Sequence, residues 1–124
     1  MFGRILGLAI LVSAPACPLL AQPAADARYH IGDTGIRCVR LPCPSRALYV
    51  PDARGMADRH NLIYADMDGN AAPPAIEASA AVIDAVAEAW REYQCIAVDG
   101  RLLGDSGGVP VLKVERIVGP CSKQ

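Results

Sequence analysis

The sequence predicts a small α+β domain, with one amphipathic helix on a small antiparallel sheet or an open, OB-like barrel, stapled by two disulfides. Three observations support this. Segments of strand character lie before and after a single helical segment, in the order β-β-α-β-β. The helical segment carries apolar residues at helical spacing. Four cysteines remain after an N-terminal export signal is removed, an even number that suits two bridges.

Two strands are expected before the helix, over residues 45–50 and 61–67, because both segments are rich in residues that favour strands. The loop between them contains Gly55, so the two strands form a plausible hairpin. The segment 29–40 contains two glycines, and any strand there is expected to be short or bent. Residues 38–44 form a tight, proline-rich corner.

The helix is expected over residues 75–92, following Pro73 and Pro74, because proline in the first turn costs no helical hydrogen bond. Glu77 near its start and Arg91 near its end would complement the helix dipole. One stripe at helical spacing is expected to face the core: Ile76, Ser79, Ile83, Val86, Ala87 and Trp90.

Two further strands are expected after the helix, over residues 93–103 and 109–118. Lys113 and Glu115 alternate with apolar neighbours, which is typical of a strand with one solvated face. The string GDSGG between these strands also surrounds the nucleophile of trypsin-like serine proteases. A serine nucleophile needs a base and a group that orients the base. The only histidines, His30 and His60, are expected at the surface, and neither lies in the Ala-Ala-His-Cys setting that those proteases use. The glycines suit a tight hairpin, so Ser106 is predicted to lie in a hairpin turn.

The N-terminus has the features of a secretory signal peptide: Arg4, a short apolar run over 5–12, and small residues before Ala21. The run is too short to span a membrane. Cleavage after Ala21 predicts a signal peptide over 1–21, a flexible leader over 22–28 and one domain over 29–124, located in the periplasm or secreted. Cleavage after Ala16 is the alternative, and it would leave Cys17 at the N-terminus, where a lipid can be attached.

The remaining cysteines are predicted to form two disulfides, because an even number in an exported chain is typical of bridges. A hairpin turning near Ser106 would bring Cys95 alongside Cys121. Cys38 and Cys43 would then close a small ring, although bridges between the two pairs remain the alternative. Disulfides also suit a core whose only aromatic residues, after removal of Phe2, are one tryptophan and four tyrosines.

The predicted ring contains Arg40, Leu41 and Pro42, which we expect to bind a partner. A disulfide-closed loop loses little entropy on binding, and a protease-inhibitor loop uses the same principle. The formal charge of −1 and the lack of a basic stripe exclude nucleic acid as a partner. The predicted function is therefore non-enzymatic binding of a protein or a small molecule, with no cofactor. Zinc is not expected, because the cysteines lack C-x-x-C spacing.

Two alternative functions follow from the acidic residues. Positions one, three, five and twelve of a calcium-binding loop are matched by Asp66, Asp68, Asn70 and Glu77. However, Ala71 stands where that loop needs glycine, and Pro73 and Pro74 fill its second half. The other alternative is a small hydrolase that uses Ser106 or a cluster of carboxylates from Asp66, Asp68, Asp99 and Asp105.

The segment RCVRLPCPSRALYV, residues 37–50, followed by a strand, a helix and a terminal hairpin, resembles a group of small exported bacterial proteins of unknown function. In that group a cysteine- and proline-containing corner precedes a short strand. The resemblance is carried by Cys38, Pro42, Cys43 and Tyr49 and covers roughly a third of the chain. It implies export and a structural cysteine pair, and it implies no activity.

Overall fold

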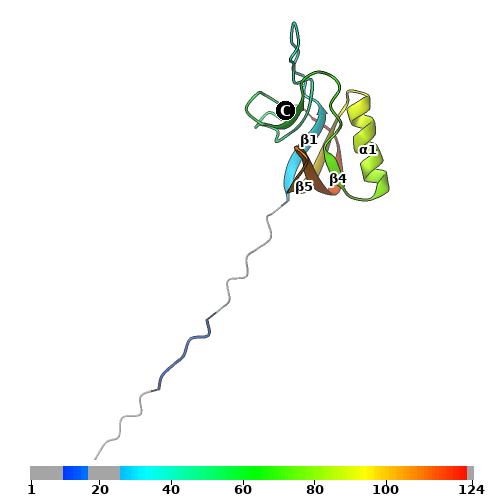
Figure 1. Cartoon of the computed structure of the whole chain (residues 1–124). Helices are drawn as coiled ribbons and strands as arrows, with labels where there is room; N and C mark the ends of the chain where they lie inside the picture. The colour runs from blue at the N-terminus through cyan, green and yellow to red at the C-terminus, as the bar shows by residue number, and fades with distance from the viewer. Residues whose placement is uncertain (1–9, 17–25, 123–124) are drawn as a thin grey trace, which may run out of the picture.

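A computed structural model of the chain describes residues 10–16 and 26–122. Within these residues, six strands and one helix are arranged as a curled, half-barrel sheet with the helix packed on it (Figure 1). The elements are β1 (Ala27–Asp33), β2 (Arg46–Tyr49), β3 (Leu62–Asp66), β4 (Ala75–Glu77), α1 (Ala80–Arg91), β5 (Cys95–Ser106) and β6 (Val109–Pro120). The predicted signal peptide lies largely outside the described residues, as does Cys17. No helix in the described part of the chain has the length and hydropathy to cross a membrane.

The sheet is mixed, with the strand order β3-β2-β1-β5-β6-β4. Four of its neighbouring pairs are antiparallel, but β4 pairs with β6 in parallel. The prediction of an antiparallel sheet in β-β-α-β-β order is therefore wrong, whereas the α+β class with one helix is confirmed. The β2–β3 hairpin and the long β5–β6 hairpin are confirmed.

Strand β1 lies at the centre of the sheet, although the sequence predicted only a short or bent strand there. It pairs with β2 on one side and with β5 on the other. Ala27 and Arg28, which were predicted in the flexible leader, form the start of this strand instead. Gly32 has a φ of +122°, and a Cβ at this position would overlap the carbonyl oxygen of Gln94. The glycine therefore permits close packing of β1 against the start of β5.

The helix begins later than predicted. Its N-cap is Ser79, whose side chain accepts a hydrogen bond from the Val82 backbone N–H. Residues 75–77 form β4 instead, because their backbone pairs with Val111–Lys113 at the edge of β6. Pro73 and Pro74 consequently precede an edge strand, a position where a missing N–H is also tolerated.

The later start changes which residues face the core. Glu77 lies on β4, so the helix has no acidic residue in its first turn, whereas Arg91 lies in the last turn as predicted. Ile83, expected in the core, is exposed. The buried residues of the helix are Val86, Ala89 and Trp90. The core that they join contains mainly aliphatic residues of the sheet: Tyr29, Ile31, Leu48, Val98, Leu112 and Val114.

A buried ion pair joins the hairpin β2–β3 to the end of the helix. Arg46 donates from Nε and Nη2 to Asp66 Oδ2, at 2.9 and 2.5 Å, and from Nη1 to the Trp90 carbonyl at 2.8 Å. Its guanidinium carbon lies 5.1 Å from the ring centroid of Trp90 and 4.4 Å from that of Tyr93. Cation–π contacts of this kind add to the attraction of the carboxylate. Within the described residues, no buried side-chain nitrogen or oxygen lacks a hydrogen-bond partner.

Candidate binding site

Residues 34–45, which we call the finger, join β1 to β2 and project beyond the sheet (Figure 1). The base of the finger is rigid. The Thr34 backbone N–H donates to the Ser45 carbonyl at 3.0 Å, and the Thr34 hydroxyl donates to the Pro44 carbonyl at 2.7 Å. Thr34 and Pro44 are both buried. The start and end of the finger are therefore fixed relative to the sheet.

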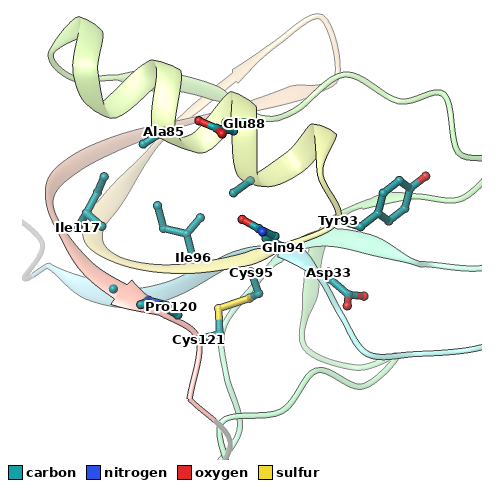
Figure 2. Close-up of a pocket in the computed structure, with 12 residues that line it drawn as sticks. Asp33, Ala85, Glu88, Tyr93, Gln94, Cys95, Ile96, Ile117, Pro120 and Cys121 are labelled. Atoms are coloured by element: carbon teal, nitrogen blue, oxygen red, sulfur yellow. A yellow bond between two sulfur atoms is a disulfide. The ribbon is translucent and has the colours of Figure 1, made fainter.

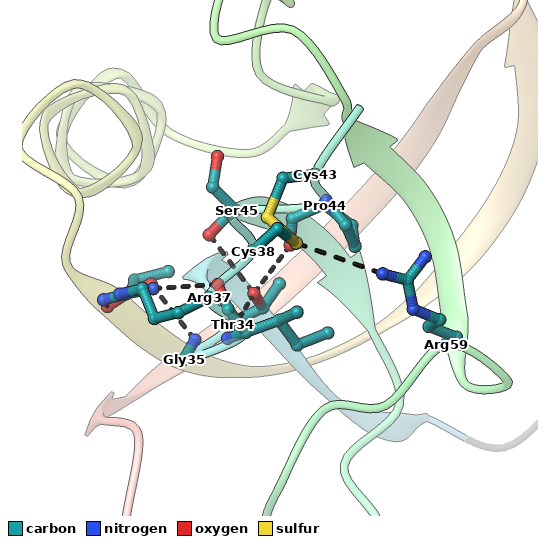
Figure 3. The surroundings of a disulfide bond; sticks show 10 residues. Thr34, Gly35, Arg37, Cys38, Cys43, Pro44, Ser45 and Arg59 are labelled. Atoms are coloured by element: carbon teal, nitrogen blue, oxygen red, sulfur yellow. Dashed lines mark hydrogen bonds and ion pairs between the residues drawn. A yellow bond between two sulfur atoms is a disulfide. The ribbon is translucent and has the colours of Figure 1, made fainter. Parts of the chain in front are cut away.

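The ring within the finger is closed by the predicted Cys38–Cys43 disulfide, with Cα atoms 5.7 Å apart (Figure 3). We call this bond the ring disulfide. Cys43 is buried, and its backbone N–H donates to the Met67 carbonyl at 3.0 Å, just beyond β3. On the other side, Arg37 pairs with Asp33 at 3.0 Å. The ring is thus attached to the domain on both sides.

The tip of the ring presents Val39, Arg40 and Leu41 to solvent. Val39 is 106% exposed and Leu41 is 65% exposed, which is high for large apolar side chains. Arg40 is also exposed, and it makes no ion pair or side-chain hydrogen bond within the described part of the chain. Pro42 is exposed beside the buried Cys43. The structure therefore brings the predicted binding residues together at one rigid, protruding point.

A cleft of about 750 Å³ lies between the helix and the ends of β5 and β6 (Figure 2). Its lining is mainly apolar and includes Ala85, Ala89, Ile96 and Ile117, with Glu88 on the helix side. This cleft was not predicted from the sequence. The sequence nevertheless contained a sign of it. Ile117 occupies the next alternate position after Lys113 and Glu115, so it places an apolar side chain on a strand face that was expected to be polar.

The wall of the cleft contains the second predicted disulfide, Cys95–Cys121, which we call the strand disulfide. Its Cα atoms lie 5.3 Å apart, and the Cys121 backbone N–H donates to the Cys95 carbonyl at 3.0 Å. The bond joins the end of β6 to the start of β5, as was predicted from the expected hairpin.

His30 is buried next to the strand disulfide, so its predicted surface position is wrong; His60 is exposed as expected. The Nδ1 atom of His30 lies 3.3 Å from the Tyr49 hydroxyl, which in turn lies 3.5 Å from Cys95 Sγ. Burial, together with the charge of Arg28, lowers the pKa of His30. Burial and nearby carboxylates raise the pKa of Tyr49 to about 12. Both side chains are therefore neutral at neutral pH.

The residues of the predicted calcium site do not converge on one point, and Asp66 and Asp68 each accept hydrogen bonds from neighbouring groups of the protein. Asp66 accepts hydrogen bonds from Arg46 and from the backbone N–H groups of Gly69 and Ala71, at 2.9 and 3.1 Å. Asp68 accepts from the Asn70 backbone N–H at 3.0 Å, and Glu77 lies on β4. Among the described residues, these carboxylates do not form a group of converging ligands. The turn therefore completes the hydrogen bonding of a buried Asp66.

The residues of the predicted hydrolase are also dispersed. Ser106 is exposed at the tip of the β5–β6 hairpin, opposite Val109. His30 lies opposite Ala97, towards the other end of β5. Asp99 lies between two arginines, at 2.6 Å from Arg28 and 2.7 Å from Arg116, and hydrogen bonds from these groups lower its pKa. The arrangement around Asp99 is an ion-pair network on the sheet surface.

Comparisons of the chain with protein-family models, with curated proteins and with solved structures find no match.

Proposed function

We propose that the protein is an exported binding module whose finger inserts its tip into an apolar, acidic pocket on a partner protein. The observation that carries this proposal is the exposure of Val39 and Leu41 on a loop that a disulfide and buried base residues hold in place. Large apolar side chains exposed together on a rigid projection are typical of interaction sites. Arg40, between them, supplies the charge that selects an acidic pocket.

The free energy gained by burying the tip residues Val39 and Leu41 suits a role as anchor residues within a larger interface. Full burial of a valine or leucine side chain contributes about 1.5–3 kcal/mol, so the two tip residues together contribute roughly 3–6 kcal/mol. The ring is already ordered before binding, which reduces the entropy lost by the loop. Arginine is also among the residues that contribute most at interface centres.

Site-specific photo-crosslinking tests this function in the native host. A photoreactive amino acid at Leu41 is expected to give a discrete crosslinked partner, whereas the same group at Gly107, on the exposed hairpin turn, is not. The crosslink should weaken when Arg40 is replaced by alanine, and when both cysteines of the ring disulfide are replaced by serine. Identical crosslinked products from both probe positions would refute a role for the finger.

A protease-inhibitor function is the second candidate, favoured by the exposed Arg40 within a disulfide-closed ring. Trypsin-like proteases accept arginine in a pocket that contains an aspartate. The full chain is expected to inhibit trypsin, and the Arg40→Ala variant to be inactive as an inhibitor. Rapid cleavage after Arg40 without inhibition would exclude this candidate and leave the general binding function standing.

Export forms the remaining part of the proposal. Two disulfides support it, because such bonds form and persist in oxidising compartments. The intact mass of the protein recovered from the periplasm or the medium is expected to correspond to cleavage after Ala21, and reduction should add the mass of four hydrogen atoms. A lipid on Cys17 would indicate cleavage after Ala16 instead. Retention of the N-terminal residues in a cytoplasmic product would contradict export.

A further inference from the structure

Two cysteines that line the cleft converge with one buried histidine. The ligand atoms of His30, Cys95 and Cys121 all lie within 4.8 Å of one another. The sheet register explains this proximity. His30 pairs with Ala97 across β1 and β5, so Cys95 is its diagonal neighbour on the same face. Cys121 follows the end of β6, next to the start of β5.

We propose that reduction of the strand disulfide converts this cluster into a zinc site, with His30, Cys95 and Cys121 as the three protein ligands. Two thiolates and one imidazole are a set of soft and borderline donors that Zn²⁺ favours. This proposal does not depend on the function proposed for the finger, because the cluster contains no residue of the finger.

The chemistry proceeds in two balanced steps. A dithiol reductant transfers two electrons and two protons to the Cys95–Cys121 bond, so that two thiols form and the reductant becomes a disulfide. Zn²⁺ then binds both sulfurs as thiolates and the neutral imidazole of His30, and two protons are released. The oxidised protein offers no thiolate at this position.

The geometry requires only a small rearrangement. Zn–S bonds of about 2.3 Å and Zn–N bonds of about 2.0–2.1 Å place tetrahedral ligands roughly 3.3–3.8 Å apart. The three ligand atoms already lie within 4.8 Å of one another. Tyr49 lies within 3.5 Å of both His30 and Cys95 and would hold these ligands in position.

Both the reductant and the fourth zinc ligand have access to the cluster. Cys95 and Cys121 are half-buried and line the cleft, so a dithiol can approach them from solvent (Figure 2). A second, smaller cavity of about 90 Å³ borders the same disulfide and Tyr49. This space is large enough for a water molecule to complete a four-coordinate site.

Metal titration of the full chain tests the proposal. Cys17, Cys38 and Cys43 are replaced by serine, so that only the two strand-disulfide thiols remain, and the protein is reduced with a phosphine. We expect one Zn²⁺ per chain, and cobalt(II) as a spectroscopic substitute should show thiolate-to-metal charge transfer. His30→Gln should weaken zinc binding more than about 100-fold. His60→Gln, at the other histidine of the chain, is the matched control and should have no effect.

Thermal unfolding distinguishes a folded site from binding to an unfolded chain. Zn²⁺ is expected to raise the Tm of the reduced protein, but not that of the oxidised protein or of reduced His30→Gln. If the reduced protein is unfolded without metal, Zn²⁺ should restore its far-UV circular dichroism, again only when His30 is present. Equal zinc affinity for the two histidine variants, or zinc binding that leaves the Tm and the circular dichroism unchanged, would overturn the proposal.

Discussion

Removal of Arg46 is expected to destabilise the protein strongly. Arg46→Met keeps much of the side-chain volume but leaves the Asp66 carboxylate, 0% exposed, without its cation. The variant also deprives the carbonyls of Trp90 and Gly69 of a donor. Breaking a buried ion pair by removing one partner costs about 3–5 kcal/mol. For a domain of this size that loss corresponds to a decrease in Tm of at least about 12 °C.

Urea unfolding followed by the fluorescence of Trp90 measures this effect directly, because Trp90 is the only tryptophan and stacks on Arg46. Arg37→Met is the matched control. Arg37 forms an ion pair with Asp33 but its side chain is 70% exposed, so its loss should change the unfolding midpoint only slightly. The double variant Arg46→Met/Asp66→Asn should be less destabilised than the sum of its single variants, because no buried charge is left unpaired. Equal losses for Arg46→Met and Arg37→Met would refute this reasoning.

Three further predictions concern the disulfides, a glycine and the response to acid. Replacing both cysteines of the strand disulfide by serine should lower the free energy of unfolding by about 3.5 kcal/mol, against about 2 kcal/mol for the ring disulfide. The difference arises because the strand disulfide closes a longer loop. Equal unfolding midpoints in denaturant for the two variants would contradict this prediction. Gly100→Ala should destabilise the protein by more than about 2 kcal/mol, because a Cβ there would overlap the Lys113 carbonyl oxygen. Gly107→Ala, at an open turn, is the control and should cost about 1 kcal/mol. Thermal unfolding of the two variants compares these losses. Burial raises the pKa of Asp66, but hydrogen bonds from Ala71, Arg46 and Gly69, together with the positive charge of Arg46, outweigh it and hold the folded-state pKa below the unfolded value of about 3.9. The ionised Asp66 therefore contributes stability above pH 4 that is lost as the pH falls through the folded-state pKa, and Asp66→Asn should abolish this part of the acid dependence.

The disulfides and the hairpins were predictable because they depend on nearby residues. A turn at Gly107 and Gly108 places residues at similar distances on either side of it opposite one another, which explains why Cys95 meets Cys121. The ring disulfide joins residues only five positions apart. The tip residues of the finger were predictable for the same reason, since a closed ring this small leaves its middle residues exposed.

The start of the helix was not predictable from local signals. Residues 75–77 suit both a helix and a strand, and the free edge of β6 decided between them by supplying backbone partners. His30 presented the same difficulty. It is an isolated polar residue in a segment where only a short or bent strand was predicted, and it was therefore expected at the surface. Its burial follows from pairing of β1 with β2 and β5, which are distant in the sequence.

The sequence by itself determined the α+β class and the exposed tip of the ring, and it favoured the two cysteine pairs that the structure contains, because these depend on turns, spacing and composition within short stretches of chain. Only the tertiary structure decided the mixed strand order, the burial of Arg46 with Asp66, and the meeting of His30 with Cys95 and Cys121. The physical reason is that a backbone hydrogen bond has the same chemistry with any partner strand. Which distant strands pair is therefore settled by the packing of the whole chain.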